Sequence, residues 1–349
     1  MEKYIKYNEL LKKPEYEFMN DNKIQKGLLY LCLGGSISYG TNTPESDTDI
    51  RGIMMNPACE IIGRTADTGQ VEDRATDTVI YTLQKAFKLF SECNPNTIEM
   101  LNVNPEHIIH MTKHGKRVLS IKDFFLSKLA IPKFGGFARQ QMSKLEHAVL
   151  ANGGEVDKRL AMCKVALEHS MDCFKMEHAK YDMNFEFNEI MDEITGEKTL
   201  GLTMNIKDVP LRAVKQSLAV ITNIYNDYTN VHKEFSKKKI EGRLSKHMMH
   251  TYRLLTSGAE LASTGKFSTY RGGDEHDLLM KIRRGDYLTA DGKNVIPEFW
   301  DLVHEAQEKF DYAAKHTVLK DEYNKEIVEG TLMEIQLDYL TGKLDTTEA

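Results

Sequence analysis

Long apolar runs are absent from this sequence of 349 residues, in which charged residues make up 28%. No stretch approaches the roughly 20 consecutive apolar residues that a membrane-spanning helix needs. The first residues, MEKYIKYNELLKKPEYEF, also lack the apolar segment of a secretory signal. We therefore expect a cytoplasmic protein with no membrane partner, long enough to form two domains.

Cysteine is scarce and odd in number, with five residues and no C-x-x-C pair. A disulfide framework needs an even set in a secreted chain, and a thiolate zinc site needs closely spaced pairs. The cysteines therefore favour reduced thiols and argue against both kinds of site. They are Cys32, Cys59, Cys93, Cys163 and Cys173.

Basic residues are outnumbered by acidic ones, which leaves a net charge of −6. The charge is distributed in blocks: residues 111–175 and 233–284 are basic, and the segments around them are acidic. Solvated faces are the ordinary explanation of such blocks. An acidic N-terminal block with two basic segments could also unite carboxylates, a metal ion and a polyanion in one cleft.

Strand patterns dominate the first third of the chain. Short apolar or β-branched runs occur in KGLLYLCLGG (26–35), DTDIRGIMM (47–55) and DTVIYTL (77–83), and each predicts a strand. The apolar residues of LQKAFKLFSEC (83–93) recur at helical spacing, so a helix follows the third strand.

Helical patterns dominate from about Ile121 onward, apart from EITGEKTLGLTMN (193–205), which has the chemistry of a hairpin or loop, and YRGGDE (270–275), which predicts a tight loop. The sequence therefore predicts an α+β protein. Residues 1–120 would form a small mixed β-sheet domain, and residues 121–349 a larger, mostly helical domain.

The stretch LGGSISYGTNTPESDTDIRG, from Leu33 to Gly52, combines two features of a ligand site. The first is Gly34-Gly35-Ser36, directly after an apolar strand. Glycines let the backbone approach a ligand closely and leave successive N–H groups pointing into a concave nest, and Ser36 adds a hydroxyl donor. One or two helical turns in SISYGT would add N-terminal amides that favour phosphate.

The second feature is the pair Asp47 and Asp49. In a strand, residues two apart project on the same side, so these carboxylates would lie next to each other. Two neighbouring carboxylates repel unless a cation lies between them. Mg²⁺ suits such a site, because it takes oxygen ligands and commonly joins one or two carboxylates to substrate phosphates. A nucleoside triphosphate with Mg²⁺ fits both features.

The spacing from Gly35-Ser36 to Asp47-x-Asp49 resembles the signature of the DNA polymerase β-type nucleotidyltransferase superfamily. Four blocks taken in order resemble one branch of it, the RNA-repair-associated, stand-alone nucleotidyltransferases of bacteria and phages. The blocks are GGSISYGTNTPESDTDIRG, DTVIYTLQKAFKLFSECNPNTIEML, KHMMHTYRLL and LLMKIRRGDY. One departure is Gln84, where the family has an arginine before the lysine that matches Lys85. No phosphate contact is therefore assigned to position 84.

The resemblance implies a third carboxylate on a neighbouring strand, which by position is Asp77. An acid at the head of an apolar strand also needs a reason of its own; Glu72 and Asp73 are nearby competitors. In the implied mechanism Asp47, Asp49 and Asp77 are the catalytic residues and the ligands of two Mg²⁺ ions, with Mn²⁺ as an alternative ion. Asp77 would also accept or orient the proton of the attacking hydroxyl.

Lys246, His250 and Arg253 lie at i, i+4 and i+7, so they share one helical face. This face would contact a triphosphate or be a solvated polar face. The expected nucleotide-binding residues are Gly34, Gly35, Ser36, Arg51, Lys85, Lys246, His250 and Arg253. For Arg51, a phosphate contact and a pairing with a neighbouring carboxylate are both open. His107, His110 and His114 are interpreted as a polar helix face.

The function implied is transfer of a nucleoside monophosphate from an NTP to a hydroxyl, with release of pyrophosphate. Residues 1–120 would be the nucleotidyltransferase domain, and 121–349 would close the cleft for nucleotide and acceptor. An RNA end is the favoured acceptor, on family association alone. The alternatives are a protein or small-molecule hydroxyl as acceptor, or a non-catalytic module that binds NTP or RNA.

Overall fold

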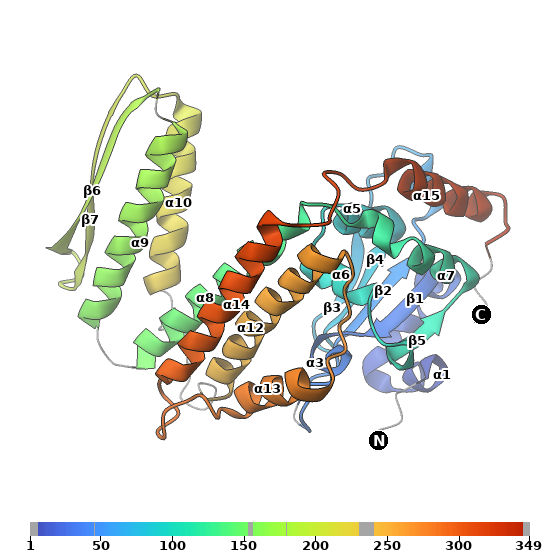
Figure 1. Ribbon diagram of the computed structural model, residues 1–349. Coiled ribbons are helices and arrows are strands. Elements are labelled where there is room, and N and C mark those ends of the chain that lie inside the picture. The colour runs from blue at the N-terminus through green and yellow to red at the C-terminus, as the bar shows by residue number, and fades with distance from the viewer. Residues whose placement is uncertain (1–5, 45, 153–155, 179, 230–240, 345–349) are drawn as a thin grey trace. The chain divides into compact units, whose positions relative to one another are not determined.

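The computed structural model describes residues 6–44, 46–152, 156–178, 180–229 and 241–344 (Figure 1). The chain divides into two compact units, which are described separately. The first comprises Met1–Gln140, Met249–Arg284 and Trp300–Ala349, and the second Gln141–Met248 and Gly285–Phe299. These boundaries differ from the domain boundary at residue 120 that the sequence predicted. The assignment of a catalytic and a cleft-closing role to the two predicted domains stays a prediction.

A five-stranded mixed sheet is the centre of the first unit, with strand order β3-β4-β2-β1-β5. β2 and β4 are parallel, and the other neighbours are antiparallel. The strands are β1 (Leu28–Leu33), β2 (Ile50–Met54), β3 (Gln70–Asp73), β4 (Thr78–Thr82) and β5 (Ile108–Met111). Every residue of β1 is buried, as expected of a central strand covered on both faces.

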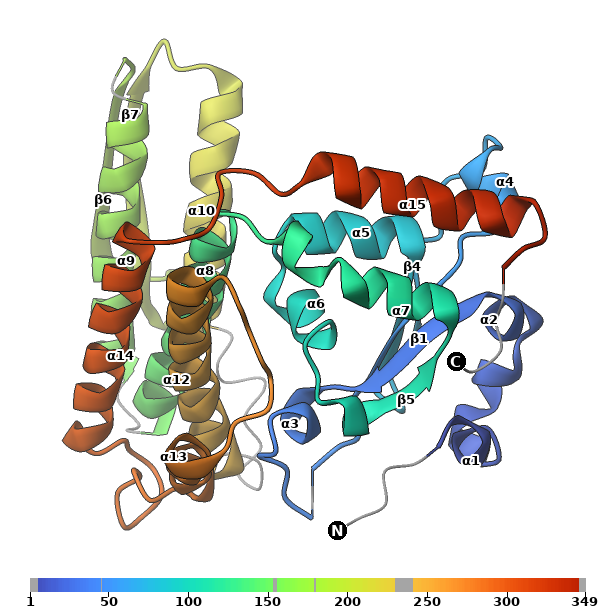
Figure 2. The ribbon, with the colours of Figure 1, turned by 45° about the vertical axis from the view of Figure 1, so that its right-hand side comes forward.

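The N-terminal helices cover one face of the sheet (Figure 2). They are α1 (Tyr7–Leu10), the 3₁₀ helix η1 (Pro14–Asn20) and α2 (Asn22–Gly27). Leu10, Met19 and Ile24 from these helices form one core cluster with Leu31 and Ile80 of the sheet.

The other face is covered by helices that come from distant parts of the chain. They are α5 (Leu83–Ser91), α7 (Lys113–Ser120), the 3₁₀ helix η3 (Lys122–Phe125) and α15 (Lys325–Leu340). Phe87 on α5 and Val328 and Ile335 on α15 belong to the same buried cluster as Leu29 and Ile53 of the sheet. The last long helix therefore returns to the core formed by the first third of the chain.

Short helices and the remaining long helices complete the first unit. The short ones are α3 (Gly35–Ser38), α4 (Ala58–Ile61), α6 (Pro95–Met100) and the 3₁₀ helix η2 (Pro105–His107). The long ones are α8 (Ala130–Asn152), α12 (Glu241–Thr264), α13 (Gly273–Arg284) and α14 (Pro297–Lys315), and all of them except α13 extend into the second unit.

The second unit contains a long hairpin packed on two helices. β6 (Asp182–Met191) pairs antiparallel with β7 (Lys198–Lys207), and α9 (Val156–Glu177) and α10 (Leu211–Thr229) cover one face. Met183, Phe185 and Phe187 alternate along β6 and are buried against these helices, while the residues between them are exposed.

The fold class inferred from the sequence is confirmed: a mixed sheet in the N-terminal region is followed by a mostly helical part. β1, β4 and α5 lie where the pattern predicts them, β2 begins at Ile50 and not at Asp47, and the stretch around Gly196 is a hairpin. β3 and β5 were not predicted. In the described part of the chain, no helix combines the length and apolar composition that a membrane crossing needs.

Candidate functional site

One edge of the sheet brings together residues that are far apart in the sequence. Leu33, at the end of β1, pairs with Ile50, the first residue of β2, and Ile50 pairs with Thr78, the first residue of β4. The segments just outside these strands therefore meet. The Gly34 amide donates to the Asp49 carbonyl (2.8 Å) and the Ile50 amide to the Asp77 carbonyl (3.2 Å).

The turn after β1 requires glycine. Gly35 has a φ of +54°, in the left-handed region, and a Cβ on it would lie 2.6 Å from Cγ of Asp49 and closer still to Oδ2. At Gly34, a Cβ would meet the Arg51 side chain at 3.3 Å. The Asp49 carboxylate therefore packs directly against the backbone of the glycine turn, with no room for any side chain at Gly35.

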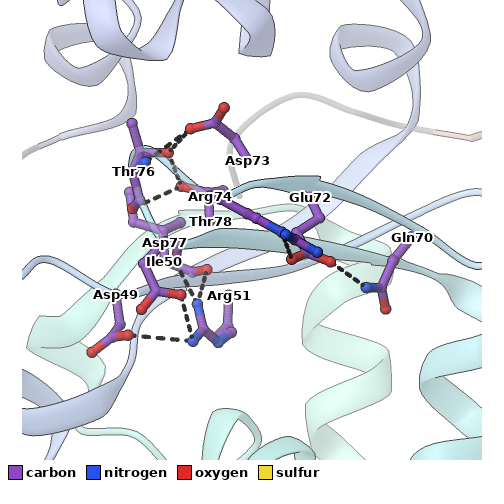
Figure 3. A network of polar contacts seen from close by, with 10 residues as sticks. All are labelled: Asp49, Ile50, Arg51, Gln70, Glu72, Asp73, Arg74, Thr76, Asp77 and Thr78. Carbon is purple, nitrogen blue, oxygen red and sulfur yellow. Dashed lines mark hydrogen bonds and ion pairs between the residues drawn. The ribbon is translucent and has the colours of Figure 1, made fainter. Parts of the chain in front are cut away.

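The guanidinium of Arg51 joins two of the three predicted carboxylates (Figure 3). Its Nη2 lies 3.3 Å from Oδ1 of Asp49 and 3.2 Å from Oδ1 of Asp77. Its Nη1 donates to the carbonyls of Asp77 (2.5 Å) and Ile50 (2.9 Å). Of the two interpretations of Arg51, the structure shows the pairing with carboxylates.

Asp77 has two properties that the sequence pattern does not show. Its φ is +46°, a conformation that is uncommon outside glycine, Asn and Asp and costs of order 1 kcal/mol. Its side chain is 55% exposed, against 20% for Asp49. The carboxylate of Asp77 is therefore held at the sheet edge by a constrained backbone, yet is accessible to a ligand from solvent.

The two competitors for the third carboxylate are engaged elsewhere (Figure 3). Asp73 accepts hydrogen bonds from the backbone amide (2.9 Å) and hydroxyl (2.7 Å) of Thr76, so it closes the turn between β3 and β4. Glu72 contacts Gln70 (3.0 Å) and Arg74 (3.4 Å). Neither forms the contact with Arg51 that Asp49 and Asp77 share.

Asp47 differs from the expectation. β2 begins at Ile50, so Asp47 and Asp49 precede the strand and do not project from it as neighbours. Asp47 is exposed, whereas Asp49 is half-buried. Among the described residues, no three His, Cys, Asp or Glu side chains form a group that could hold a metal ion.

The donor set nevertheless suits Mg²⁺, whose preferred ligands are oxygens. Asp49 and Asp77 turn their carboxylates to one shared cation, the guanidinium of Arg51. Because the same position already attracts a positive charge, these two residues fit a divalent cation there. A site with three carboxylates would require Asp47 to turn toward them.

Ser36 and Lys85 lie at different ends of the first unit's strands. Ser36 is half-buried on α3, directly after the glycine turn. Lys85 follows β4 on α5 and lies alongside Gly69. Since Asp77 precedes β4 and a strand rises about 3.3 Å per residue, the five residues of β4 separate Lys85 from the carboxylates. The structure does not bring Lys85 to the site.

Arg253 is buried and already paired, so it does not lie on a solvated polar face. Its guanidinium carbon lies 3.8 Å from the ring centroid of Tyr39, and Nη2 lies 3.4 Å from Oε1 of Glu99. Both side chains of the ion pair are nearly buried, at 8% and 12% exposure. Burial raises the pKa of the Tyr39 phenol well above its ordinary value, and the Glu99 carboxylate adds to the shift.

The residues from 249 to 284 hold the segment after the glycine turn at further points. Nε2 of His276 lies 2.9 Å from the Gly40 carbonyl, and the ring of Tyr270 lies against Gly40. Sequence reasoning missed Tyr39 and Glu99. Each lies in a sequence block that carries the family resemblance, and this position was the signal from which a role near the site could have been inferred.

The other two residues of the predicted face do not share this environment. His250 is half-buried on α12, and Lys246 is exposed. Lys246 belongs to the second unit and is therefore described apart from the carboxylates. The three residues of the predicted face therefore differ in burial, from exposed Lys246 to buried Arg253.

The interpretation of three histidines as a polar helix face is wrong. His107 lies in η2, His110 in β5 and His114 in α7, and all three are buried. The short sequence NPEHIIHM forms a 3₁₀ turn and the edge strand β5, which hydrogen-bonds to β1. Helical spacing alone did not reveal this.

A mixed sheet with a glycine turn after one strand, and carboxylates before two adjacent parallel strands, has the arrangement expected of the polymerase β-type superfamily. The chain belongs to the RNA repair pathway DNA polymerase beta family, whose model matches residues 13–204. The match includes the whole sheet and the candidate site, and ends within β7.

One curated relative is an uncharacterized 38.9 kDa protein of Enterobacteria phage T4, 35% identical over 85 residues. The alignment covers 22% of this chain and 25% of that protein, so the chain matches about a quarter of the relative's length. No solved structure matches the chain.

Proposed function

We propose that the protein is a nucleotidyltransferase that moves a nucleoside monophosphate from an NTP to a hydroxyl acceptor and releases pyrophosphate. The observation that carries the proposal is the meeting of Gly35, Asp49 and Asp77 at one edge of the sheet. The favoured acceptor is the end of an RNA, because the description of the family names RNA repair.

The glycine turn would receive the triphosphate. With no Cβ at Gly34 or Gly35, a phosphate oxygen can approach the backbone N–H groups. The hydroxyl of Ser36 on α3 would donate a charge-assisted hydrogen bond to the β- or γ-phosphate. Arg51, two residues after Asp49, is a cation in contact with that carboxylate, and on release from the carboxylates its planar fork could pair with phosphate oxygens.

Asp49 and Asp77, with Asp47 turned toward them, would hold Mg²⁺. The ion would supply neutralisation of the triphosphate charge and would acidify the attacking hydroxyl. Because Arg51 occupies the shared position between Asp49 and Asp77, its guanidinium has to leave when the ion binds. The chain therefore supplies its own cation for the metal-free state.

In the reaction the acceptor oxygen forms a bond to the α-phosphorus while the bond from that phosphorus to the oxygen bridging to the β-phosphorus breaks. Asp77 takes the proton of the hydroxyl, and its exposed carboxylate is the one an acceptor can reach. The electron pair of the broken bond leaves with pyrophosphate. Positioning and charge neutralisation are the main sources of rate acceleration in such transfers.

Arg253 would act through position and not through contact with the nucleotide. Its stacking on Tyr39 and its ion pair with Glu99 fix the segment that follows Ser36. A change in this segment would move the glycine turn against Asp49. We therefore assign Arg253, Tyr39 and Glu99 to the support of the triphosphate site.

The proposal is tested by incubating the protein with each α-labelled NTP, Mg²⁺, and RNA, DNA or cell lysate as acceptor, and by following both label and pyrophosphate. Label on RNA with equimolar pyrophosphate is the expected result. Label only on protein or on a small molecule would contradict the RNA acceptor while keeping the transfer. No pyrophosphate with any acceptor would overturn the proposal in favour of a binding module.

A further inference from the structure

A basic pocket lies between α7 and α15, away from the candidate active site. Its volume is about 700 Å³, and it is lined by Lys113, His114, Lys116, Arg117, Ser120, Asp338 and Lys343. Four of these seven side chains are permanent cations, and one is an acid. We propose that this basic pocket binds the phosphate backbone of an RNA strand, a role that rests on the proposed RNA acceptor.

The cations of α7 share one face of the helix. Lys113, Lys116 and Arg117 lie at i, i+3 and i+4, and Ser120 at i+7 continues the same face. All four are exposed. Because the opposite face of α7 is buried through Val118, the helix cannot rotate to scatter these charges. The cations at the start of the basic block that begins at residue 111 are therefore fixed on one side of α7.

The acids near the basic pocket are already paired, and the lysines are not. Asp338 lies 3.1 Å from Nε2 of His114, and Glu334 forms an ion pair with Arg117. Lys113, Lys116 and Lys343 have no ion pair with any residue that the structure describes. Three ammonium groups around one opening repel each other, which an anionic ligand would relieve.

The wall of the basic pocket is rigid. His114 is 5% exposed, and its contact with Asp338 ties α7 to α15. Ile335 on α15 and Val118 on α7 are fully buried in the core of the sheet unit. Cations on a fixed frame lose less conformational freedom on binding than those on a loop, so the frame favours binding.

The distance between the basic pocket and the candidate active site indicates that the ligand is a polymer. Thr112, just before α7, donates its amide to the Leu29 carbonyl at the start of β1 (3.0 Å), whereas the glycine turn follows the other end of β1. A six-residue strand spans about 20 Å. A mononucleotide at Asp77 cannot reach the basic pocket, but a strand of several nucleotides can contact both.

Lysine suits backbone contacts in particular. Its ammonium is a point charge without the planar fork of arginine, so it attracts phosphates without selecting a base. A volume near 700 Å³ accommodates more than one phosphate and its sugar. The basic pocket would therefore bind internal phosphates without sequence preference, while the end of the strand lies at the carboxylates.

The test is the affinity of the whole protein for a labelled single-stranded RNA 20-mer, measured by fluorescence anisotropy without NTP across a range of salt concentrations. Lys113→Ala, Lys116→Ala and Lys343→Ala are combined in one variant. A matched control combines Lys309→Ala, Lys315→Ala and Lys320→Ala, three exposed lysines outside the basic pocket. Both variants change the net charge equally, and thermal unfolding checks that both fold.

The pocket variant should lose at least tenfold in affinity near 0.1 M salt. Its plot of log affinity against log salt should be shallower by about 2, since each single-strand phosphate contact contributes about 0.7. Equal losses in both variants, or none in the pocket variant, would overturn the proposal. So would displacement of RNA by inorganic phosphate as effective as by unlabelled RNA, because the pocket would then bind free anions.

RNA binding by the basic pocket and nucleotidyl transfer to RNA can fail independently of each other. Binding is measured without NTP and therefore without turnover, so the RNA affinity reports on the lysines of the basic pocket and not on the transfer reaction. If RNA binds through the lysines but receives no label, the transfer to RNA fails and the basic pocket stands. If label is transferred to RNA in the pocket variant with unchanged RNA affinity, the pocket fails and the transfer stands.

Discussion

Single residues at the sheet edge show how narrowly the candidate site is built. Gly35 combines a left-handed backbone with direct contact to the Asp49 carboxylate, and Arg51 joins that carboxylate to Asp77. The geometry therefore explains why each of these residues is needed at its position, and substitution can test each explanation.

Gly35→Ala should reduce activity about 100-fold and lower the free energy of unfolding by roughly 1–2 kcal/mol. The stability loss comes from the left-handed backbone. The activity loss comes from displacement of Asp49, since misplacement of a reacting group by about 1 Å has an effect of this size. NTP turnover and urea unfolding measure the two effects.

The control is Gly196→Ala, which also has a positive φ (+70°) but no heavy atom near its would-be Cβ. It should lose similar stability and keep full turnover. Equal turnover in both variants would show that the contact of Gly35 with Asp49 has no role in catalysis.

Arg51→Ala should increase the affinity for Mg²⁺ alone several-fold. The guanidinium competes for the carboxylates, and without it Asp49 and Asp77 repel each other until a cation arrives. In metal-free buffer the variant should be less stable by about 1–2 kcal/mol, as expected for lost hydrogen bonds to charged groups. Added Mg²⁺ should restore much of that difference.

Thermal unfolding as a function of Mg²⁺ concentration, without nucleotide, measures this competition. Arg51→Lys is the companion variant, because it keeps a positive charge but not the fork that spans both carboxylates. A Mg²⁺ dependence identical to that of the wild type would mean that Arg51 and the ion do not share a position.

At the scale of elements, helices far along the chain support the turn after β1. α12 contributes Arg253 and α6 contributes Glu99, and both contact or approach Tyr39 at the end of α3. α13 adds the contact of His276 with Gly40. The segment that would bind the triphosphate is therefore fixed by three helices.

Arg253→Ala should lower the free energy of unfolding by about 3–5 kcal/mol, because it leaves the Glu99 carboxylate buried without its partner. The exposed Lys266→Ala in the same unit should change it by less than about 0.5 kcal/mol. Urea unfolding measures both.

Arg253→Lys, which keeps a charge near Glu99, should recover part of the stability and raise KM for NTP more than it lowers kcat. If the Arg253→Ala protein is as stable as the wild type but has an altered KM for NTP, the supporting role is wrong and Arg253 contacts the triphosphate.

The elements that the sequence predicted correctly are those with dense local signals. β1 and β4 are runs of apolar or β-branched residues, and α5 has a clear helical period. β3 was missed because QVED is short and three of its four residues are polar, and β5 because IIHM follows a proline turn. Both are edge strands, and pairing across the sheet determines them more than propensity does.

The candidate site was predictable only as far as local spacing reaches. Gly35, Asp49 and Asp77 could be found from the glycine turn, the aspartate pair and the strand that follows. The pairing of Arg51 with both carboxylates depends on the parallel register of β2 and β4, which no local pattern encodes. The burial of Arg253 depends on contacts across more than a hundred residues.

On the scale of the whole molecule, the chain returns repeatedly to its first third. α15 completes the core of the sheet through Val328 and Ile335, and the segment 249–284 belongs to the same unit as the glycine turn. The family match ends at residue 204, before these segments. The proposed chemistry therefore rests on the matched sheet, while part of its support comes from sequence outside the match.

The central claim is that the carboxylates at this sheet edge perform nucleotidyl transfer, and Asp77→Asn tests it most directly. Asn keeps the size of the side chain and tolerates the left-handed backbone of Asp77, so the fold should persist. Asp73→Asn is the control, since Asp73 is an acid at the same edge that bonds to Thr76.

The measurement is pyrophosphate release at saturating Mg·NTP, with calorimetry to confirm that each variant binds the nucleotide. The account predicts that Asp77→Asn keeps much of the Mg·NTP affinity but releases pyrophosphate about 10²–10⁴-fold more slowly, the range expected for loss of a general base. Asp73→Asn should match the wild type. An Asp77→Asn protein as active as the wild type would contradict the account.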